Sequence, residues 1–569
     1  MACVKRCLPL AVVATTLLAA AACGKDEAHR TPAPATTSSE PASAKAGAET
    51  GAAAEADPAA RAAAMSDADL AGQVLMPYAY GSDATTVDKT SAAGNRGLAG
   101  VDTPAQMVAK FHLGGLILVS FTAQDPTGST NPATNVENPQ QVRKLTDGLQ
   151  TAAREAELPP LMIGTDQEYG VVTRVTQGVT MLPSAMGAGA AGKPALTEAA
   201  WHAAGEELAA MGITVDFAPV ADTLGPPANT VIGSRSFGAD PKANADQVAA
   251  VVRGLRSAGV AAGLKHFPGH GHTDRDSHAT LPVVKQSRDA WTAQDLPPFR
   301  SGVTAGADVV MSGHLDVQAL DKGVPATFSH KIMTDELRGA LKFGGVAITD
   351  AMNMPPAMQW PPGEAAVRAL NAGNDMLLMP PDITKARDGI LAGLKDGSLK
   401  RERLVEAVTR ILTLKAKKSG RPAEGGSGAA HEQAVAALDA ASITVLKGAC
   451  GGPLLTGPVT VTAADGREAA RINLVKALQA LGVPVQAAGG KVIHLVGYGD
   501  SALDLDQSAA ITVMMDTPYL LASAKSPTLI ATYSSSRLSL TTLAAVIAGK
   551  AKATGRSPVA VAGLPRSAC

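Results

Sequence analysis

The densest group of side chains capable of chemistry lies in residues 264–282, LKHFPGHGHTDRDSHATLP. The glycines and proline of this segment favour a shaped loop over a helix or a strand. Asp276 and His278 stand two positions apart, so in an extended loop both side chains can face the same way. A carboxylate beside an imidazole fixes its tautomer and raises its basicity. The pair therefore predicts general acid–base catalysis near neutral pH.

Two other interpretations of the same segment stay open. Its histidines and aspartates are residue types that commonly bind metal ions. Lys265, however, would place a cation among the ligands, and no familiar His or Cys ligand spacing is present. The second alternative is a capped loop with an incidental histidine. We expect proton transfer and no metal or other cofactor.

Asp350 is a further candidate, because it directly follows the apolar run of residues 345–349. An acid at the end of a buried strand either caps the next helix or acts on a substrate. As a nucleophile it would attack an electrophilic carbon and form a covalent intermediate. The local sequence does not choose between these two roles.

From about residue 66 onward, short apolar runs alternate with stretches whose apolar residues recur at helical spacing. This alternation predicts an α/β fold in which a (β/α)8 TIM barrel forms the N-terminal part, with a doubly wound open sheet as the alternative. We place the barrel at residues 63–420. The expected strands lie within residues 72–80, 114–121, 160–168, 213–222, 261–269, 307–314, 345–352 and 374–380.

Polar residues gather at the C-terminal ends of these runs. The carboxyl ends of barrel strands form the face on which barrel enzymes carry their active sites. The sequence therefore predicts that these residues meet in one site. They are Asp166, Asp222, Lys265, His266, His314 and Asp350.

A second α/β pattern follows a Gly-rich segment, residues 421–432, which we interpret as a linker. The pattern predicts a smaller C-terminal α/β sandwich domain over residues 433–569. Its expected strands lie at 443–447, 458–463, 491–498, 510–516, 528–534 and 558–563.

The composition narrows the classes of function. The chain has 569 residues, of which 46% are apolar, so there is ample material for a large core. Lys and Arg number 50 against 51 Asp and Glu, and the formal charge is -1. Nucleic-acid binders normally show a basic excess, so we expect no nucleic-acid partner. Nothing in the sequence predicts an oligomeric state.

The N-terminus is typical of an export signal. Lys5 and Arg6 precede an apolar run, and small residues lead into Cys23. The stretch before Cys23 resembles a bacterial lipobox, which predicts a signal peptide over residues 1–23, lipidation of Cys23 and an extracytoplasmic, membrane-anchored protein. The alternative is an ordinary secretory signal with an incidental cysteine. Residues 24–62 carry almost no large apolar side chains and are predicted to form a flexible tether.

Cys450 and Cys569 would form an even pair in an oxidising compartment if Cys23 is acylated. They bracket the C-terminal segment almost end to end. We expect a disulfide between them, and two free thiols are the alternative.

Four motifs together resemble glycoside hydrolase family 3. They are the K-H-F-P-G-H-G-x4-D-S-H segment of residues 265–278, I-G-S-R-S-F-G at 232–238, D-Q-E at 166–168 and T-D-A-M at 349–352. The resemblance is strong over about 66–420 and weaker over 430–569. Within the family, the Asp-Ser-His dyad resembles that of the bacterial β-N-acetylglucosaminidases.

The resemblance implies a role for each matching residue. Asp350 would be the nucleophile, and His278 would be the general acid/base assisted by Asp276. The remaining residues would bind the hydroxyls of N-acetylglucosamine, and these are Asp166, Arg174, Arg235, Lys265 and His266. The chain departs from the family where Tyr169 and Val171 replace a Gly and an Arg, which affects the expected fine specificity.

The resemblance thus implies an anchored exo-β-N-acetylglucosaminidase that acts on cell-wall muropeptides or chitin-derived sugars by a retaining mechanism. A phosphorylase, in which phosphate replaces water in the second step, is one alternative. A β-glucosidase of the same family is another. The non-enzymatic alternative, motivated by Tyr169 and Val171, is a sugar-binding protein on a decayed hydrolase scaffold.

Overall fold

The computed structural model describes residues 57–120, 133–227, 229–273, 275–418 and 428–569. The predicted signal peptide, Cys23 and most of the predicted tether lie outside these residues. Helix α1 (Pro58–Ala64) begins inside the predicted tether, so the tether prediction is wrong at its C-terminal end. An alanine-rich segment can form a helix, because alanine has the highest helix propensity. Asp57 caps helix α1 by accepting a hydrogen bond from the Ala59 amide.

Each of the eight predicted apolar runs contains a parallel strand. Six of the strands form one sheet in the order β2-β3-β4-β5-β7-β9, and β1 pairs with β10. A bridge from Ile348 to Met376 and a hydrogen bond from the Ile117 amide to the Pro77 carbonyl (3.0 Å) link the two sheets into a barrel. The strands are β1 Leu75–Met76, β2 Gly115–Ile117, β3 Met162–Thr165, β4 Val215–Asp216, β5 Ala261–Phe267, β7 Val309–Ser312, β9 Val346–Thr349 and β10 Leu377–Leu378.

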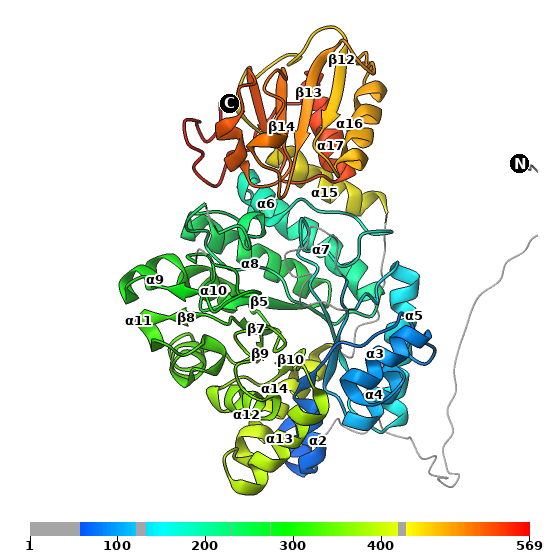
Figure 1. Cartoon of the computed structure of the whole chain (residues 1–569), viewed down its shortest axis with the longest axis vertical. Helices are drawn as coiled ribbons and strands as arrows, with labels where there is room; N and C mark the ends of the chain where they lie inside the picture. The colour runs from blue at the N-terminus through cyan, green and yellow to red at the C-terminus, as the bar shows by residue number, and fades with distance from the viewer. Residues whose placement is uncertain (1–56, 121–132, 228, 274, 419–427) are drawn as a thin grey trace, which may run out of the picture. The chain divides into compact units, whose positions relative to one another are not determined.

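The predicted barrel is therefore confirmed. Helices surround its strands, as Figure 1 shows around β5, β7, β9 and β10. Among the described barrel helices, three begin with a capping side chain followed by proline: Thr103 caps α4, Asn138 caps α5 and Asp240 caps α8. The barrel helices are α2 Asp67–Gln73, α3 Lys89–Ala99, α4 Pro104–Phe111, α5 Pro139–Glu155, α6 Ala185–Ala191, α7 Pro194–Ala210, α8 Pro241–Ser257, α9 Arg288–Gln294, α10 Leu296–Thr304, α12 Pro362–Ala372, α13 Ile383–Asp396 and α14 Arg401–Lys418.

Shorter elements lie in the connections of the barrel. The 3-10 turn η2 (Gly233–Arg235) follows β4, and the two-residue strands β6 (Val283–Val284) and β8 (Asp316–Val317) pair beside the histidine-rich loop. The others are α11 Gln318–Asp321, the 3-10 turn η3 Ala326–Phe328 and the π-helix η4 Lys331–Ala340.

The C-terminal part contains a five-stranded sheet in the order β11-β15-β14-β13-β12. All neighbouring strands are parallel except β11 and β15. The strands are β11 Thr444–Lys447, β12 Val459–Ala463, β13 Lys491–Val496, β14 Ile511–Met514 and β15 Thr528–Ala531; the helices are α15 Ala429–Ser442, α16 Glu468–Ala480 and α17 Arg537–Ile547, with the 3-10 turns η5 Ala502–Asp504 and η6 Pro518–Ser523.

Both faces of this sheet are buried, because successive side chains of a strand point to opposite sides. Val513 packs with residues of α16 and α17 on one face. Met514, the next residue, packs on the other face against Val220 and Ile232 from the barrel. The predicted layered α/β domain is confirmed, and one of its faces shares a hydrophobic core with the barrel.

Two details of the C-terminal prediction are wrong. Residues 558–563 form no strand: Val559 and Val561 are buried in the core shared with the barrel, and the Pro558 carbonyl accepts from the Ala239 amide (3.2 Å). Burial against the barrel produces the same apolar alternation as a strand would. The predicted linker also ends too late, since α15 begins at Ala429, and residues 421–427 lie outside the described part.

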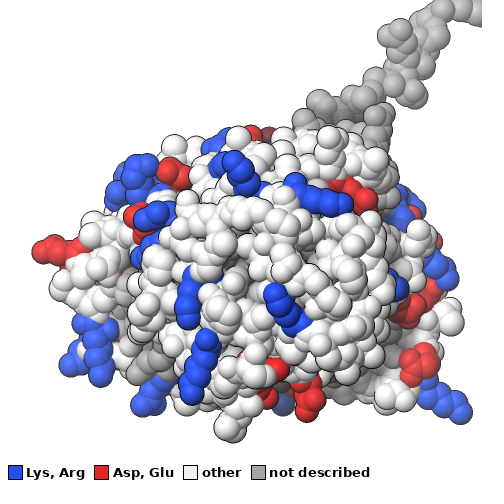
Figure 2. All heavy atoms as spheres, turned by 90° about the horizontal axis from the view of Figure 1, so that it is seen from above, with Lys and Arg blue, Asp and Glu red and all other residues white. Residues whose placement is uncertain are grey.

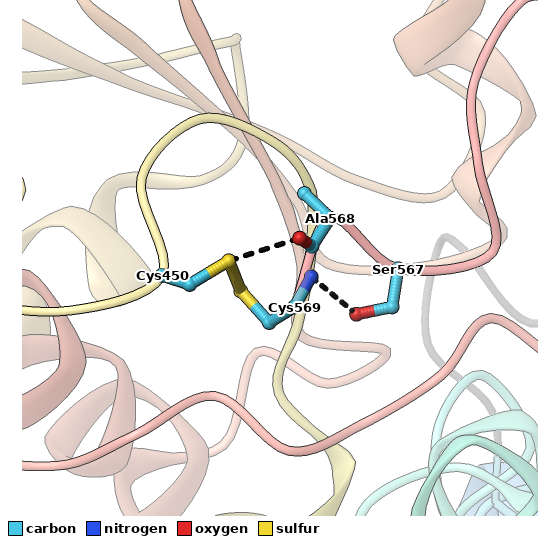
Figure 3. The surroundings of a disulfide bond; sticks show 4 residues. All are labelled: Cys450, Ser567, Ala568 and Cys569. Atoms are coloured by element: carbon cyan, nitrogen blue, oxygen red, sulfur yellow. Dashed lines mark hydrogen bonds between the residues drawn. A yellow bond between two sulfur atoms is a disulfide. The ribbon is translucent and has the colours of Figure 1, made fainter.

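A disulfide joins Cys450 to Cys569, whose Cα atoms are 5.3 Å apart (Figure 3). The neighbouring Ala568 amide donates to the Val445 carbonyl of β11 (2.7 Å). The end of the chain is thus tied to the edge strand of the sheet.

Charged side chains of both signs are scattered among neutral ones on the face seen in Figure 2. No helix in the described part of the chain is both long enough and apolar enough to cross a membrane.

Candidate active site

The strand ends converge on a cavity of about 440 Å³, counted with its open mouth. Most of the site residues predicted from the sequence line it. Asp276, Asp222 and His314 do not: Asp276 supports His278 from behind, Asp222 holds His266, and His314 lies 3.0 Å from the Ala351 carbonyl. The lining residues are Asp166, Glu168, Val172, Arg174, Arg235, Lys265, His266, His278, Met311, Asp350, Ala351, Met354, Leu378 and Met379.

A network of buried ion pairs forms one wall. The Lys265 ammonium lies 2.7 Å from Asp166 Oδ1 and 2.6 Å from Glu168 Oε1. Arg235 donates through Nε and Nη2 to the two oxygens of Glu168, at 2.7 and 2.9 Å. Arg174 Nη2 reaches the other oxygen of Asp166 at 3.4 Å. The wall presents fixed charged donors and acceptors of the kind that bind sugar hydroxyls.

The charges of this wall stabilise one another. Burial alone would raise the pKa of Asp166, but Lys265 and Arg174 outweigh it and hold the pKa below its usual value. The pKa of Glu168 is lowered in the same way by Arg235 and Lys265. Burial would lower the pKa of Lys265, yet the two carboxylates raise it. All three groups are therefore charged at neutral pH.

Asp350 follows β9 directly and lies on the cavity. Its amide donates to the Ser312 carbonyl (2.9 Å), and its Oδ1 accepts from the Ala351 amide (2.7 Å). The next helix, α12, begins only at Pro362, so the helix-capping interpretation is wrong. Burial would raise the pKa of Asp350, but His266, His314 and His278 outweigh it and lower the pKa. The result is a partly buried, ionised carboxylate facing the cavity.

His278 and Asp276 form the pair that their spacing predicts. Asp276 Oδ1 lies 2.7 Å from His278 Nδ1 and also accepts from the His278 amide (2.8 Å). Burial would raise the pKa of Asp276, and the hydrogen bond to His278 more than offsets this and lowers it. The carboxylate orients the ring, so that Nε2 is the nitrogen available for proton transfer.

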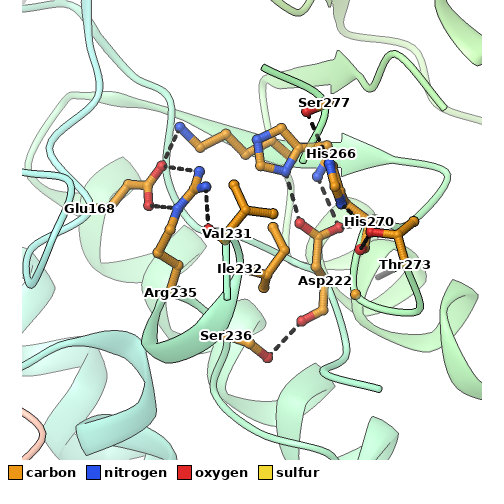
Figure 4. A network of polar contacts seen from close by, with 12 residues as sticks. Glu168, Asp222, Val231, Ile232, Arg235, Ser236, His266, His270, Thr273 and Ser277 are labelled. Atoms are coloured by element: carbon orange, nitrogen blue, oxygen red, sulfur yellow. Dashed lines mark hydrogen bonds and ion pairs between the residues drawn. The ribbon is translucent and has the colours of Figure 1, made fainter. Parts of the chain in front are cut away.

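His266 is held by Asp222, a residue at a strand end to which the sequence assigned no separate role. Asp222 lies 2.8 Å from His266 Nδ1 and accepts from the His266 amide (3.1 Å), and Figure 4 shows its carboxylate pointing at the ring. Glu168, by contrast, is a residue that sequence reasoning missed as a site member. Its place in the D-Q-E motif is the signal that could have identified it.

Tyr169 points away from the cavity. It has a positive φ of 63° and is buried against Trp201, with ring centroids 5.4 Å apart in an edge-to-face arrangement. Gln167 instead closes the turn, accepting from the amides of Arg174 (3.0 Å) and Val175 (2.9 Å). Neither of the residues that depart from the family pattern, Tyr169 and Val171, lines the cavity, whereas the neighbouring Val172 does.

The histidines of the loop are engaged separately rather than aimed at one point. His272 lies 2.8 Å from Asp295, and His270 lies 3.0 Å from Ser277. Within the described ranges, no three His, Cys, Asp or Glu side chains are grouped as a metal ion would require.

Comparison with known proteins places this geometry in a family. The model of "Glycosyl hydrolase family 3 N terminal domain" matches residues 87–414. The chain is 35% identical over 341 residues to a beta-hexosaminidase A of Pseudoalteromonas piscicida, covering 55% of each protein. It is 39% identical over 252 residues to a beta-hexosaminidase of Alkalilimnicola ehrlichii, covering 43% of this chain and 71% of that protein.

A solved structure matches over more of the chain. It is a glycoside hydrolase family 3 beta-N-acetylglucosaminidase from Paenibacillus sp. str. FPU-7, with a TM-score of 0.75, 29% identity and coverage of 88% of this chain and 99% of that one. The chain spans about half the length of the Pseudoalteromonas piscicida relative. Because the family model matches residues 87–414 and these residues build the site, the chain belongs to glycosyl hydrolase family 3, whose members cleave O-glycosyl bonds.

Proposed function

We propose that the protein is a retaining exo-β-N-acetylglucosaminidase that hydrolyses terminal, non-reducing β-linked N-acetylglucosamine. The observation that carries this proposal is that the ionised Asp350 and the Asp276-oriented His278 share one cavity with a wall of fixed charges. The names of the relatives, beta-hexosaminidase and beta-N-acetylglucosaminidase, support the choice of sugar.

In the first step, an Asp350 oxygen attacks the anomeric carbon while the bond to the leaving oxygen breaks. His278 donates its Nε2 proton to that oxygen, so the aglycone departs as a neutral alcohol. Asp276 stabilises the imidazolium before the transfer and holds the neutral ring in place afterwards. The product is a glycosyl ester on Asp350.

In the second step, His278 takes a proton from a water molecule, whose oxygen attacks the anomeric carbon and releases the Asp350 carboxylate. Two displacements on opposite faces of the sugar give net retention of configuration. The sugar hydroxyls are bound by Asp166, Arg174, Arg235, Lys265 and His266. Bonds that tighten as the ring distorts lower the barrier.

The deciding experiment compares nitrophenol release from the β-N-acetylglucosaminide and the β-glucoside, with and without phosphate. We expect turnover of the N-acetyl substrate that does not depend on phosphate. Asp350→Ala should lower kcat by about a thousandfold or more, because no glycosyl ester can form. Stimulation by phosphate would identify a phosphorylase, and preference for the glucoside a β-glucosidase. A folded wild-type protein without turnover would favour sugar binding alone.

We further propose that the enzyme is anchored outside the cytoplasm through lipidated Cys23 and acts on peptidoglycan fragments or chitooligosaccharides. The apolar run and the small residues before Cys23 support this proposal. In a bacterial host, the wild type should partition with membranes and Cys23→Ala should be found in the soluble extracytoplasmic fraction. Equal partitioning of both proteins would overturn the anchor.

A further inference from the structure

The turn that carries the catalytic pair has few ties to the rest of the barrel. Its hydrogen bonds are mostly internal. The Asp276 side chain accepts from the His278 amide through Oδ1. The Asp276 carbonyl accepts from the amides of Ala279 (3.1 Å) and Thr280 (3.0 Å). Among the described residues, a single hydrogen bond links 276–280 to a side chain outside the turn. It joins the buried Ser277 hydroxyl to His270 Nε2 at 3.0 Å.

His270 is itself rigidly held. Its ring is buried with 1% exposure. Its amide donates to Asp222 Oδ1 (2.8 Å), and its carbonyl accepts from Asn229 Nδ2 (2.9 Å). The ring's other nitrogen, Nδ1, lies 3.0 Å from the Thr273 hydroxyl. The ring therefore has a hydroxyl at each nitrogen and little freedom to turn.

The two hydroxyls match a neutral ring. A neutral imidazole has one donor and one acceptor nitrogen, and a hydroxyl can serve either. Burial, with a smaller effect from His266, lowers the pKa of His270 to about 4, so the ring is neutral at working pH. The His270 ring forms a hydrogen bond with Ser277. It does not line the cavity, so it cannot exchange protons directly with a bound substrate.

Asp222 joins this arrangement to the sugar-binding side of the site. One of its oxygens accepts from the amides of both His266 and His270, and the other lies 2.8 Å from the His266 ring. Figure 4 shows the dashed lines from Asp222 to both histidines, with Ser277 and Thr273 on different sides of His270. The buried Asp222 carboxylate therefore holds both His266, the proposed sugar-binding residue, and His270, which supports the catalytic turn.

We propose that His270 and Ser277 are positioning residues for proton transfer: the Ser277–His270 hydrogen bond latches the turn so that His278 points at the leaving oxygen. This inference rests on the proposed role of His278 as acid/base. It predicts that loss of the latch impairs only the steps that need the proton, and leaves sugar binding and attack by Asp350 intact.

The test uses Ser277→Ala in the full-length protein with two aryl N-acetylglucosaminides. Dinitrophenolate leaves without protonation, whereas a poorer leaving group such as methylphenol needs the acid. We expect kcat/KM to fall about 10- to 100-fold for the poor leaving group and less than about threefold for the activated one, since general acids contribute about 10²–10⁴-fold. Azide, which needs no general base, should raise kcat on the dinitrophenyl substrate and yield the glycosyl azide.

Three comparisons make the result decisive. Ser442→Ala removes another buried hydroxyl, which bonds the Asp439 carbonyl at 2.9 Å, and should change neither substrate's kinetics. Ser277→Thr keeps the hydroxyl, so its kcat/KM for the substrate with the poor leaving group should be close to that of the wild type. Thr273→Val removes the hydroxyl partner of His270 Nδ1 and should show a smaller loss of kcat/KM for the poor leaving group. This variant provides the test if Ser277→Ala does not fold.

Equal loss on both substrates, or no loss on either, would overturn the latch. His278→Ala separates this failure from failure of the proposed function. If His278→Ala shows the leaving-group dependence and azide rescue but Ser277→Ala does not, the latch alone is wrong. If His278→Ala shows neither, the acid/base assignment on which the latch rests is wrong.

Discussion

Lys265 shows how much of this site depends on charge balance among single side chains. Its ammonium touches Asp166 and Glu168, and Glu168 in turn holds Arg235 through two bonds. Removing one member leaves the opposite charges buried and unpaired, which is costly in a dry interior. The wall thus acts as a unit in which a neutral replacement at one residue changes the positions of the others.

Glu168→Gln tests this unit. We expect the free energy of unfolding to fall by about 3 kcal/mol, because two buried cations lose their shared partner. KM should rise about tenfold as Lys265 and Arg235 shift. Thermal melting and steady-state kinetics measure both effects. Glu198→Gln breaks an exposed pair with Arg253 instead and should change neither by much; a Glu168→Gln protein equal to that control would contradict the argument.

Residue types and spacing predicted which side chains gather at the site but not how they pair. The Asp276–His278 contact spans two positions and is readable locally. The Glu168–Arg235 and Asp222–His266 contacts span 67 and 44 positions, so they depend on the order and register of the strands. The sequence also did not show that the ring of Tyr169, whose φ is positive, packs in the core against Trp201.

At the scale of elements, strands were predicted well because a parallel strand buried on both faces appears in the sequence as a continuous apolar run. Strand β5 is buried at every position. Residues 558–563 have the same appearance but are buried by the barrel without a pairing partner in the sheet. The sequence pattern thus predicts that a segment is buried, but not whether a neighbouring strand or another part of the protein buries it.

Helix α15 carries a prediction at this scale. Asp439 is fully buried there with a hydrogen bond from Ser539, and burial raises its pKa to about 7. Its folded pKa exceeds the unfolded value, so its favourable contribution is complete below about pH 4 and is lost as pH rises through about 7. Asp439→Asn keeps the acceptor for Ser539 and should be more stable at pH 8 by on the order of 1–2 kcal/mol.

Melting temperatures at pH 5 and pH 8 measure this difference, and the Asn variant should lose less stability between them than the wild type. Asp396→Asn is the control, since that exposed carboxylate has a lowered pKa from its bonds to Ser398. An unchanged pH dependence in Asp439→Asn would show that Asp439 is not the group that titrates.

At the scale of the whole molecule, the C-terminal sheet supports the barrel's site as well as its core. Asp516, just after β14, is buried and accepts a hydrogen bond from Ser234, the residue before Arg235. Thr517 packs beside Gly233 in the same turn. A residue far along the chain thus helps to fix Arg235 in the cavity wall, a relation that no local pattern in the sequence predicts.

Asp516→Ala should therefore raise KM about three- to tenfold and leave kcat within about twofold, because Arg235 loses support while Asp350 and His278 are untouched. Steady-state kinetics on the nitrophenyl N-acetylglucosaminide give the two constants. Asp506→Ala removes a carboxylate that only caps an exposed turn at Ser508 and should match the wild type. A fall in kcat with KM unchanged would refute this role for Asp516.

The Cys450–Cys569 disulfide encloses strands β12 to β15 together with helices α16 and α17. A protease that cuts the backbone once anywhere inside this ring, for instance after the exposed Lys525, would open a chain end without releasing a fragment. Both pieces would stay covalently attached to the barrel until a thiol reductant separated them. In the extracytoplasmic location proposed above, where reductants are scarce, a nicked molecule would therefore keep the domain that supports Arg235.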